Sequence, residues 1–213
     1  MVKQSLPTES RNQLFISSKN ESVRMFENNI LDYLSRVRPW VPLAIYTPII
    51  LGCIVWYFIH FPKVWPGLGI FFLGVFFWSF FEYSLHRWFF HFKSNSNIGK
   101  RIHFIIHGIH HAYPNDHLRL VMPPGFSLPL AVLIFGLSLI FWRNNTPIFF
   151  AGFASGYLLY DCLHYAVHHF NFRNPLFQKL KKHHMMHHFR DPESAFGFTS
   201  SIWDKVFGTD IKN

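Results

Sequence analysis

Charged residues are scarce in this chain. They make up 15% of its 213 residues, against about 25% in a typical soluble domain. Half of the residues are hydrophobic and 20% are aromatic, which excludes an ordinary soluble globular domain. The formal net charge of +9 does not indicate nucleic-acid binding, because the basic residues lie beside long apolar runs. Membrane topology and anionic lipid headgroups explain them better.

Cysteine pairs and signal-peptide features are also missing. Cys53 and Cys162 lie inside apolar segments, so they indicate no disulfide framework. Residues 1–40 contain no apolar region of the kind that a cleavable signal peptide requires. We expect residues 1–40 to form an N-terminal cytoplasmic segment and residues 41–213 to form one domain, which suits a chain of this length.

Long uncharged runs are what the sequence has instead. A helix needs about 20 apolar residues to cross a bilayer, and four stretches qualify. The predicted spans are residues 41–61, 66–85, 123–142 and 146–167. The fold class is therefore all-α, with four transmembrane helices and a helical cap made of residues 86–122 and 164–213.

The basic residues predict how these spans are oriented. Lys and Arg number six in residues 1–40, five in 86–122 and seven in 170–213, which is 18 of the 20 in the chain. The positive-inside rule places those three segments in the cytoplasm. Both termini would then be cytoplasmic, in a multi-pass protein of the bacterial inner membrane or the endoplasmic reticulum.

Histidine is unusually frequent, with 15 residues. His60 falls on the outer side of the predicted topology, and the other 14 fall on the cytoplasmic half. Ten of them repeat at spacings of three to five residues. These ten are His86, His91, His107, His110, His111, His164, His168, His184, His187 and His188.

The spacing of these ten side chains predicts two metal ions. Residues three or four apart share one face of a helix, so His107 with His111, or His164 with His168, can address one point. Adjacent residues point about 100° apart, so neighbours such as His110 and His111 suit two ions. Ten imidazoles also exceed what one ion takes. Burying so many without a shared purpose would be costly.

The remaining histidines receive other interpretations. A single histidine near a membrane helix end is more often an interfacial hydrogen-bonding residue than a ligand, and we interpret His60, His103 and His117 in this way. His169 and His183 break the repeating spacing, which favours supporting or structural roles. Imidazole suits Zn, Cu, Fe and Ni. The number of ligands favours a dinuclear redox centre over a hydrolytic zinc site with three protein ligands.

Several segments resemble the membrane fatty acid hydroxylase superfamily, over about residues 20–210. The histidine boxes are shared with sterol desaturases and carotenoid hydroxylases. Other segments are more similar to the fatty acid 2-hydroxylase (sphingolipid α-hydroxylase) branch. The segments are 22–26 (SVRMF), 82–91 (EYSLHRWFFH), 107–111 (HGIHH), 119–124 (RLVMPP), 160–169 (YDCLHYAVHH) and 196–209 (FGFTSSIWDKVFGT).

The resemblance implies a di-iron monooxygenase of lipid metabolism. The family's ten ligands fall on the ten histidines given above. The resemblance also implies O₂ as co-substrate, a fatty acyl or sphingolipid substrate, and an external electron donor of the cytochrome b5 or ferredoxin type. Residues 1–40 lack the haem-binding His-Pro-Gly-Gly of the cytochrome b5 domain that many members carry. Zinc is expected to substitute readily for iron in imidazole sites.

The expected ligands divide between the two ions on grounds of geometry. One ion would take His86, His91, His107, His111 and His187, and the other would take the remaining five.

Two acidic residues share helical faces with expected ligands. Asp161 lies three residues before His164, and Glu82 lies four before His86. Each is interpreted either as a carboxylate that orients an imidazole or as half of an interfacial ion pair with Arg87 or a nearby Lys.

Two further hypotheses remain beside the 2-hydroxylase. A sterol desaturase-like or carotenoid hydroxylase-like oxidase would share the histidine boxes. A metal transporter would place ligands near the bilayer midplane, whereas the middles of the predicted spans carry none.

Overall fold

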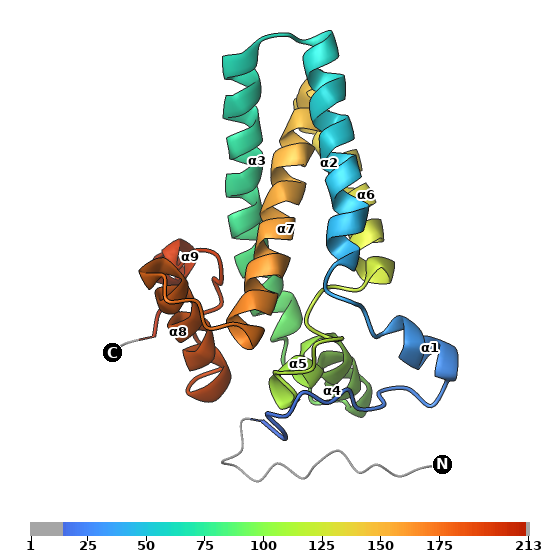
Figure 1. Cartoon of the computed structure of the whole chain (residues 1–213), viewed down its shortest axis with the longest axis vertical. Helices are drawn as coiled ribbons and strands as arrows, with labels where there is room; N and C mark the ends of the chain where they lie inside the picture. Colours follow the sequence, from blue (N-terminus) through green and yellow to red (C-terminus); the bar gives the residue numbers. More distant parts are fainter. Residues whose placement is uncertain (1–14, 212–213) are drawn as a thin grey trace.

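The computed structural model describes residues 15–211, and within this range all of the regular secondary structure is helical (Figure 1). The all-α prediction is confirmed for those residues, and the expectation for residues 1–14 falls outside them. The elements in chain order are α1 (Asn29–Leu34), α2 (Val41–His60), α3 (Val64–Ser84), η1 (Leu85–Phe90), α4 (Asn97–His103), η2 (Phe104–Gly108), α5 (Ile109–Ala112), α6 (Pro124–Trp142), η3 (Arg143–Asn145), α7 (Thr146–His169), α8 (Pro175–Phe189) and α9 (Ile202–Phe207).

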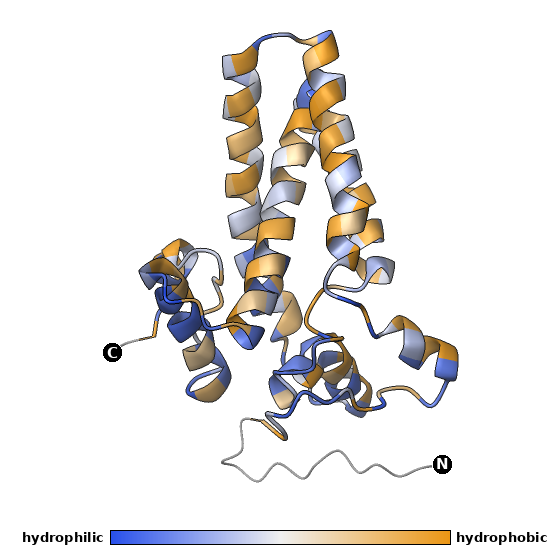
Figure 2. Cartoon of the chain, in the orientation of Figure 1, coloured by the Kyte–Doolittle hydropathy of each residue, from blue (hydrophilic) through white to orange (hydrophobic). Residues whose placement is uncertain are grey.

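Within residues 15–211, three segments are long and apolar enough to cross a membrane. They are Val41–His60, Val64–Phe90 and Pro124–His169. The third has 46 residues and contains both α6 and α7, joined by the short 3₁₀ turn η3. The helices begin and end within two residues of the predicted runs, except that the second continues through η1. Figure 2 shows that the long helices are mostly hydrophobic and that the polar segments gather at one end.

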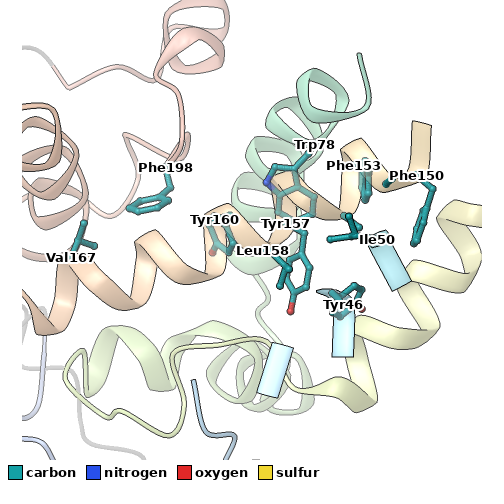
Figure 3. Close-up of a cluster of buried hydrophobic side chains, with 12 residues drawn as sticks. Tyr46, Ile50, Trp78, Phe150, Phe153, Tyr157, Leu158, Tyr160, Val167 and Phe198 are labelled. Carbon is teal, nitrogen blue, oxygen red and sulfur yellow. The ribbon is translucent and has the colours of Figure 1, made fainter. Parts of the chain in front are cut away.

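Helix α7 is the centre of the bundle. It packs against α3, α2 and α6, and in Figure 1 it lies between α2 and α3. Much of its length is buried, whereas the other long helices bury only a few side chains each. In the core, Trp78 of α3 lies against Phe153 and Tyr157 of α7, with ring centroids 5.3 and 5.4 Å apart (Figure 3). Helix α7 is thus the most buried helix, and its packing fixes the positions of the histidines that it carries.

Two glycines allow α3 and α7 to approach each other closely. A Cβ atom on Gly152 would overlap the backbone carbonyl of Phe71, and one on Gly74 would overlap that of Phe149. Small residues at such a contact let two membrane helices pack backbone against backbone. This contact fixes η1, at the end of α3, relative to the last turns of α7.

The cap elements lie together at one end of the long helices. Figure 1 shows α4, α5, α8 and α9 at this end, with α8 and α9 beside each other. Helix α8 begins where the Asn174 side chain accepts hydrogen bonds from the N–H groups of Leu176 and Phe177, followed by Pro175 at the first position. Helix α4 begins after Ser96, whose side chain accepts a hydrogen bond from the N–H of Gly99. These caps fix where the histidine-bearing helices start.

Candidate metal centre

Ten imidazoles form two groups in the cap. Within each group, one nitrogen from every ring lies within 4.8 Å of the others. The first group, which we call site A, contains His86, His91, His107, His111 and His187. The second, site B, contains His110, His164, His168, His184 and His188. The membership of the two groups is the same as in the division expected from the sequence.

Helical spacing accounts for most of site B. His164 and His168 lie four residues apart on α7, and His184 and His188 lie four apart on α8, so each pair shares a helix face. His110 of α5 completes the group. The adjacent residues His110 and His111 belong to different sites, as do His187 and His188.

Site A depends on a local widening of the helix. The backbone N–H of His91 donates to the carbonyl of His86 at 3.1 Å, across five residues. This is the hydrogen bond of the π-helical turn η1, and such turns are frequent at functional sites. The wider turn brings His91 to the same side as His86, although their separation is not the three or four residues that an α-helix requires. A second π-helical turn, η2, carries His107.

The distances between nitrogens fit metal ligation. The Nε2 of His110 is 3.0 Å from that of His164, and the Nε2 of His184 is 2.9 Å from that of His168. In site A the Nε2 of His107 lies 3.1 Å from His86 Nε2 and 3.0 Å from His111 Nε2. A neutral imidazole has a single N–H, so one nitrogen cannot bond both neighbours in this way. Nitrogens about 2.1 Å from one ion, at right angles, lie about 3 Å apart.

Other buried nitrogens of the two sites make no hydrogen bond among the described residues. Within the described chain, five of them have no hydrogen-bond acceptor or donor in reach. They are His91 Nε2, His187 Nε2, His110 Nδ1, His164 Nδ1 and His188 Nδ1. Buried polar atoms are normally satisfied. The two Nε2 atoms fit the place of metal-binding nitrogens in site A, and the donor set as a whole fits two transition-metal ions.

The cap imidazoles are held neutral. Burial, followed by the neighbouring rings, lowers the pKa of His107, His110, His111, His184 and His188 well below the ordinary histidine value. Burial lowers the pKa of His91 to about 2 and that of His187 to about 4. Metal binding requires the unprotonated ring, so these side chains are ready to bind near neutral pH.

Two backbone carbonyls orient rings of site A. His86 donates its Nδ1–H to the carbonyl of Phe196 at 2.7 Å, and His187 donates its Nδ1–H to that of Ser194, also at 2.7 Å. Each bond directs the ring's Nε2 lone pair towards the group. Such outer hydrogen bonds fix the tautomer and the orientation of metal-binding histidines.

The other five histidines lie outside both groups. His60 is exposed and its Nδ1 bonds the Trp56 carbonyl at 2.8 Å, while His117 Nδ1 bonds Asn20 Oδ1 at 2.7 Å. His169 packs on Tyr165. His103 lies next to the His91 ring without joining site A. His183 Nε2 is 3.7 Å from Asp204 Oδ2, so the structure gathers His184 and not His183.

The two acidic residues singled out in the sequence are buried in different surroundings. Glu82 accepts hydrogen bonds from the N–H groups of Phe198 and Thr199, both at 2.8 Å. It therefore bonds the C-terminal loop, while Arg87 bonds Tyr83. Asp161 lies beside Met122 and Tyr157, and its Oδ2 has no partner within the described residues.

Asp204 was not singled out from the sequence. It is fully buried and accepts hydrogen bonds from the N–H groups of Phe196 and Gly197, at 2.9 and 2.8 Å. These residues belong to the loop whose carbonyls hold His86 and His187. The available signal was a lone acidic residue inside the largely apolar stretch from Phe196 to Phe207.

A cavity of about 330 Å³ opens beside the two sites. His107 of site A and His110 and His164 of site B form part of its wall. Most of the remaining wall is apolar and comes from the segment before α2, from η2 and α5, and from the segment that leads into α6. A largely apolar cavity with a few polar groups is the usual form of a small-molecule site.

Comparison with known proteins identifies a family and several relatives that this chain resembles. The sequence profile of the family described as fatty acid hydroxylase matches residues 71–209. A dihydroceramide fatty acyl 2-hydroxylase of Arabidopsis thaliana is 39% identical over 193 residues, which is 89% of this chain and 80% of that protein. The ceramide very long chain fatty acid hydroxylase of Saccharomyces cerevisiae is 43% identical over 150 residues, which is 66% of this chain and 37% of that protein.

A solved structure agrees with these matches. The hydroxylase domain of full-length Scs7p superimposes with a TM-score of 0.81 at 35% sequence identity, covering 86% of this chain and 70% of that one. The profile match spans the residues of both sites, and the chain covers most of the Arabidopsis relative. The chain therefore belongs to the fatty acid hydroxylase family.

Proposed function

We propose that this protein is a membrane monooxygenase that hydroxylates carbon 2 of fatty acyl chains, either free or amide-linked in a sphingolipid. Relatives at 35–43% identity are named fatty acid 2-hydroxylase, dihydroceramide fatty acyl 2-hydroxylase or ceramide hydroxylase. The observation that carries the proposal is the apolar cavity whose wall includes ligands of both sites. The protein is an oxidoreductase.

The ten histidines would hold two iron ions, one in each site. When bound, iron supplies the activation of O₂ that attack on an unactivated C–H bond requires. In the balanced reaction, the acyl chain, O₂, two electrons and two protons give the 2-hydroxyacyl product and water. The electrons would come from a separate donor of the cytochrome b5 or ferredoxin type. Zinc would bind the same imidazoles without supplying this chemistry.

The cavity wall holds the substrate and excludes water. Ile106, Leu120, Val121 and Phe126 provide apolar surface for the acyl chain. Arg119 also lines the cavity, but Asp32 and Asp116 neutralise it through ion pairs at 3.2 and 3.1 Å. Among the described residues, the wall thus offers no free cation to hold a carboxylate or phosphate deep inside. An acyl chain fits this surface better than an anionic metabolite does.

The depth of the sites supports attack near the carbonyl. The sites lie where the long helices end and the polar segments begin, which is the level of lipid headgroups. A lipid whose polar head rests at this level presents the carbon next to its carbonyl first. A mid-chain position would need a cavity that extends much farther into the bundle.

We further propose four spans with both termini in the cytoplasm. At 1.5 Å per residue, the 46-residue segment Pro124–His169 would be about 69 Å long as one helix, more than twice the thickness of a bilayer core. Because α6 and α7 pack on each other, they form a hairpin and cross separately. Residues 1–40 would then be an N-terminal cytoplasmic segment, and 41–213 the hydroxylase domain with both sites on the cytoplasmic side.

Mass spectrometry of host lipids, with and without the gene, tests the function. We expect 2-hydroxy fatty acids to appear, free or within sphingolipids. The change Val121→Trp, which fills the cavity wall, should abolish the product while the metal content stays at the wild-type value. Val132→Trp is the matched control, because Val132 is 72% exposed on α6. Desaturated or ring-hydroxylated lipids would instead indicate a desaturase-like or carotenoid hydroxylase-like enzyme.

A further inference from the structure

Two buried carboxylates hold the segment that follows α8. We call residues 194–209 the C-terminal clasp. Asp204 accepts the N–H groups of Phe196 and Gly197, and Thr209 Oγ1 donates to its Oδ1 at 2.8 Å. Glu82 of α3 accepts the N–H groups of Phe198 and Thr199. Four successive backbone N–H groups, from Phe196 to Thr199, are therefore bound by two carboxylates.

This binding fixes a backbone conformation that is unfavourable by itself. Ala195 has a φ of 57°, in the left-handed region that L side chains rarely adopt. Its neighbours Ser194 and Phe196 carry the two carbonyls that bond histidines. Such a conformation persists only where the surrounding contacts determine it. The carboxylates thus set the positions of both carbonyls.

The two carbonyls act on one site only. Phe196 accepts from His86 and Ser194 accepts from His187, and both rings belong to site A. In site B, the Nδ1 atoms of His110, His164 and His188 have no partner among the described residues. The clasp meets site B through the ring of Phe198, whose centroid lies 5.5 Å from that of His164 and 5.0 Å from that of His184. The clasp therefore gives site A hydrogen bonds and site B a ring contact.

We propose that Asp204 is a positioning residue for site A, acting through the clasp, so that metal affinity at site A depends on it and affinity at site B does not. The proposal rests on the two metal sites of the proposed function. Loss of an outer hydrogen bond to a metal-binding histidine typically lowers metal affinity by about 10- to 100-fold. The same loss should appear here when a carboxylate one step farther out is changed.

Metal titration of the purified full chain is the test. Zn²⁺ is titrated into apo protein in competition with a chelator, and bound metal is counted on folded, monodisperse material. The wild type should bind two ions. Asp204→Asn should lower the affinity for one ion by about 10- to 100-fold and leave the affinity for the other within about threefold of the wild-type value. Asp210→Asn is the matched control, because it makes the same charge change at a partly exposed position six residues farther along.

Double variants identify which ion is weakened. His91→Ala disables site A and His168→Ala disables site B. Adding Asp204→Asn to His168→Ala should lower the affinity for the single remaining ion. Adding it to His91→Ala should leave the remaining ion unchanged. Equal weakening of both ions, or weakening in the His91→Ala background, would mean that Asp204 supports the cap in general and would overturn the proposal.

A milder variant covers the case in which Asp204→Asn does not fold. Thr209→Val removes one hydrogen bond to Asp204 and the contact with Tyr83 Oη, and leaves the carboxylate in place. It should weaken site A alone, by less than Asp204→Asn does. If Thr209→Val binds both ions with wild-type affinity, the proposal fails. A wild-type chain that binds no pair of ions would instead refute the metal sites of the proposed function.

Discussion

His86 and His91 are joined across five residues by the backbone hydrogen bond of a π-helical turn. The sequence places these two histidines too far apart to share a face of an ordinary α-helix. The π-helical turn widens the backbone and brings the two side chains to the same side. Helix α3 packs on α7 through Gly74 and Gly152, and the turn that follows α3 thus supplies two side chains to site A. The geometry of site A is thus a property of the backbone as well as of residue types.

Each chain should bind two metal ions. The adjacent pairs His110–His111 and His187–His188 divide between the two sites, which one ion cannot arrange. Metal analysis of protein purified anaerobically should give a ratio near two iron per chain. His168→Ala, which changes site B alone, should give a ratio near one. A wild-type ratio that stays at one would contradict two sites.

Replacing His184 and replacing His183 should have opposite outcomes. His184→Ala removes a buried imidazole of site B and should lower hydroxylase activity by at least about 100-fold. His183→Ala changes a side chain outside both groups and should keep most of the activity. Product formation per folded chain is the measurement. An active His184→Ala together with an inactive His183→Ala would show that the ligand assignment in α8 is shifted by one residue.

The apo protein should lose stability as the pH falls below about 6.5. Histidines of an unfolded chain titrate near 6.5, whereas burial holds the pKa of His187 near 4 and those of His110 and His188 well below 6.5. Between these values the unfolded state binds more protons, so the free energy of unfolding decreases with falling pH. Above pH 6.5 the contribution of these histidines should no longer change.

Thermal unfolding of apo protein in detergent at pH 7.5, 6.0 and 5.0 measures this effect. The midpoint should fall at each step below pH 6.5. The His187→Gln variant has one buried histidine fewer and should show a shallower dependence. A midpoint that rises on acidification would mean that these histidines are protonated in the folded state.

Reporter fusions should place both chain ends on the cytoplasmic side. The expectation follows from the distribution of Lys and Arg over the predicted topology. A reporter that works only in the cytoplasm should be active when it is fused after residue 213. A reporter that works only outside the cytoplasm should be active when it is inserted at residues 143–145, in the turn η3. A C-terminal reporter on the outer face would refute the topology.

Gly152→Leu should destabilise the bundle. Any side chain at this position overlaps the backbone of Phe71, so α3 and α7 must move apart. Overpacking of this kind costs about 1–3 kcal/mol. Gly136→Leu on α6 is the control, because a Cβ there meets no atom within 4 Å. The two variants should differ clearly in thermal midpoint, and equal midpoints would argue against the close helix contact.

The sequence alone predicted which histidines lie together in the two groups. Helical periodicity is local, so pairs such as His164 with His168 were readable from their spacing, and the apolar runs located the long helices. Tertiary structure decided what periodicity cannot express. The π-helical turn at Leu85–Phe90, which brings His91 to site A, follows from packing at the end of α3.

The contacts of the clasp were likewise decided by tertiary structure. Glu82 bonds Thr199 across 117 residues, and Asp204 shapes the loop that orients His86, although neither relationship leaves a periodic trace in the sequence. A local pattern records which face of a helix a residue occupies. It does not record which distant backbone group will meet that face, because that depends on how the whole chain packs.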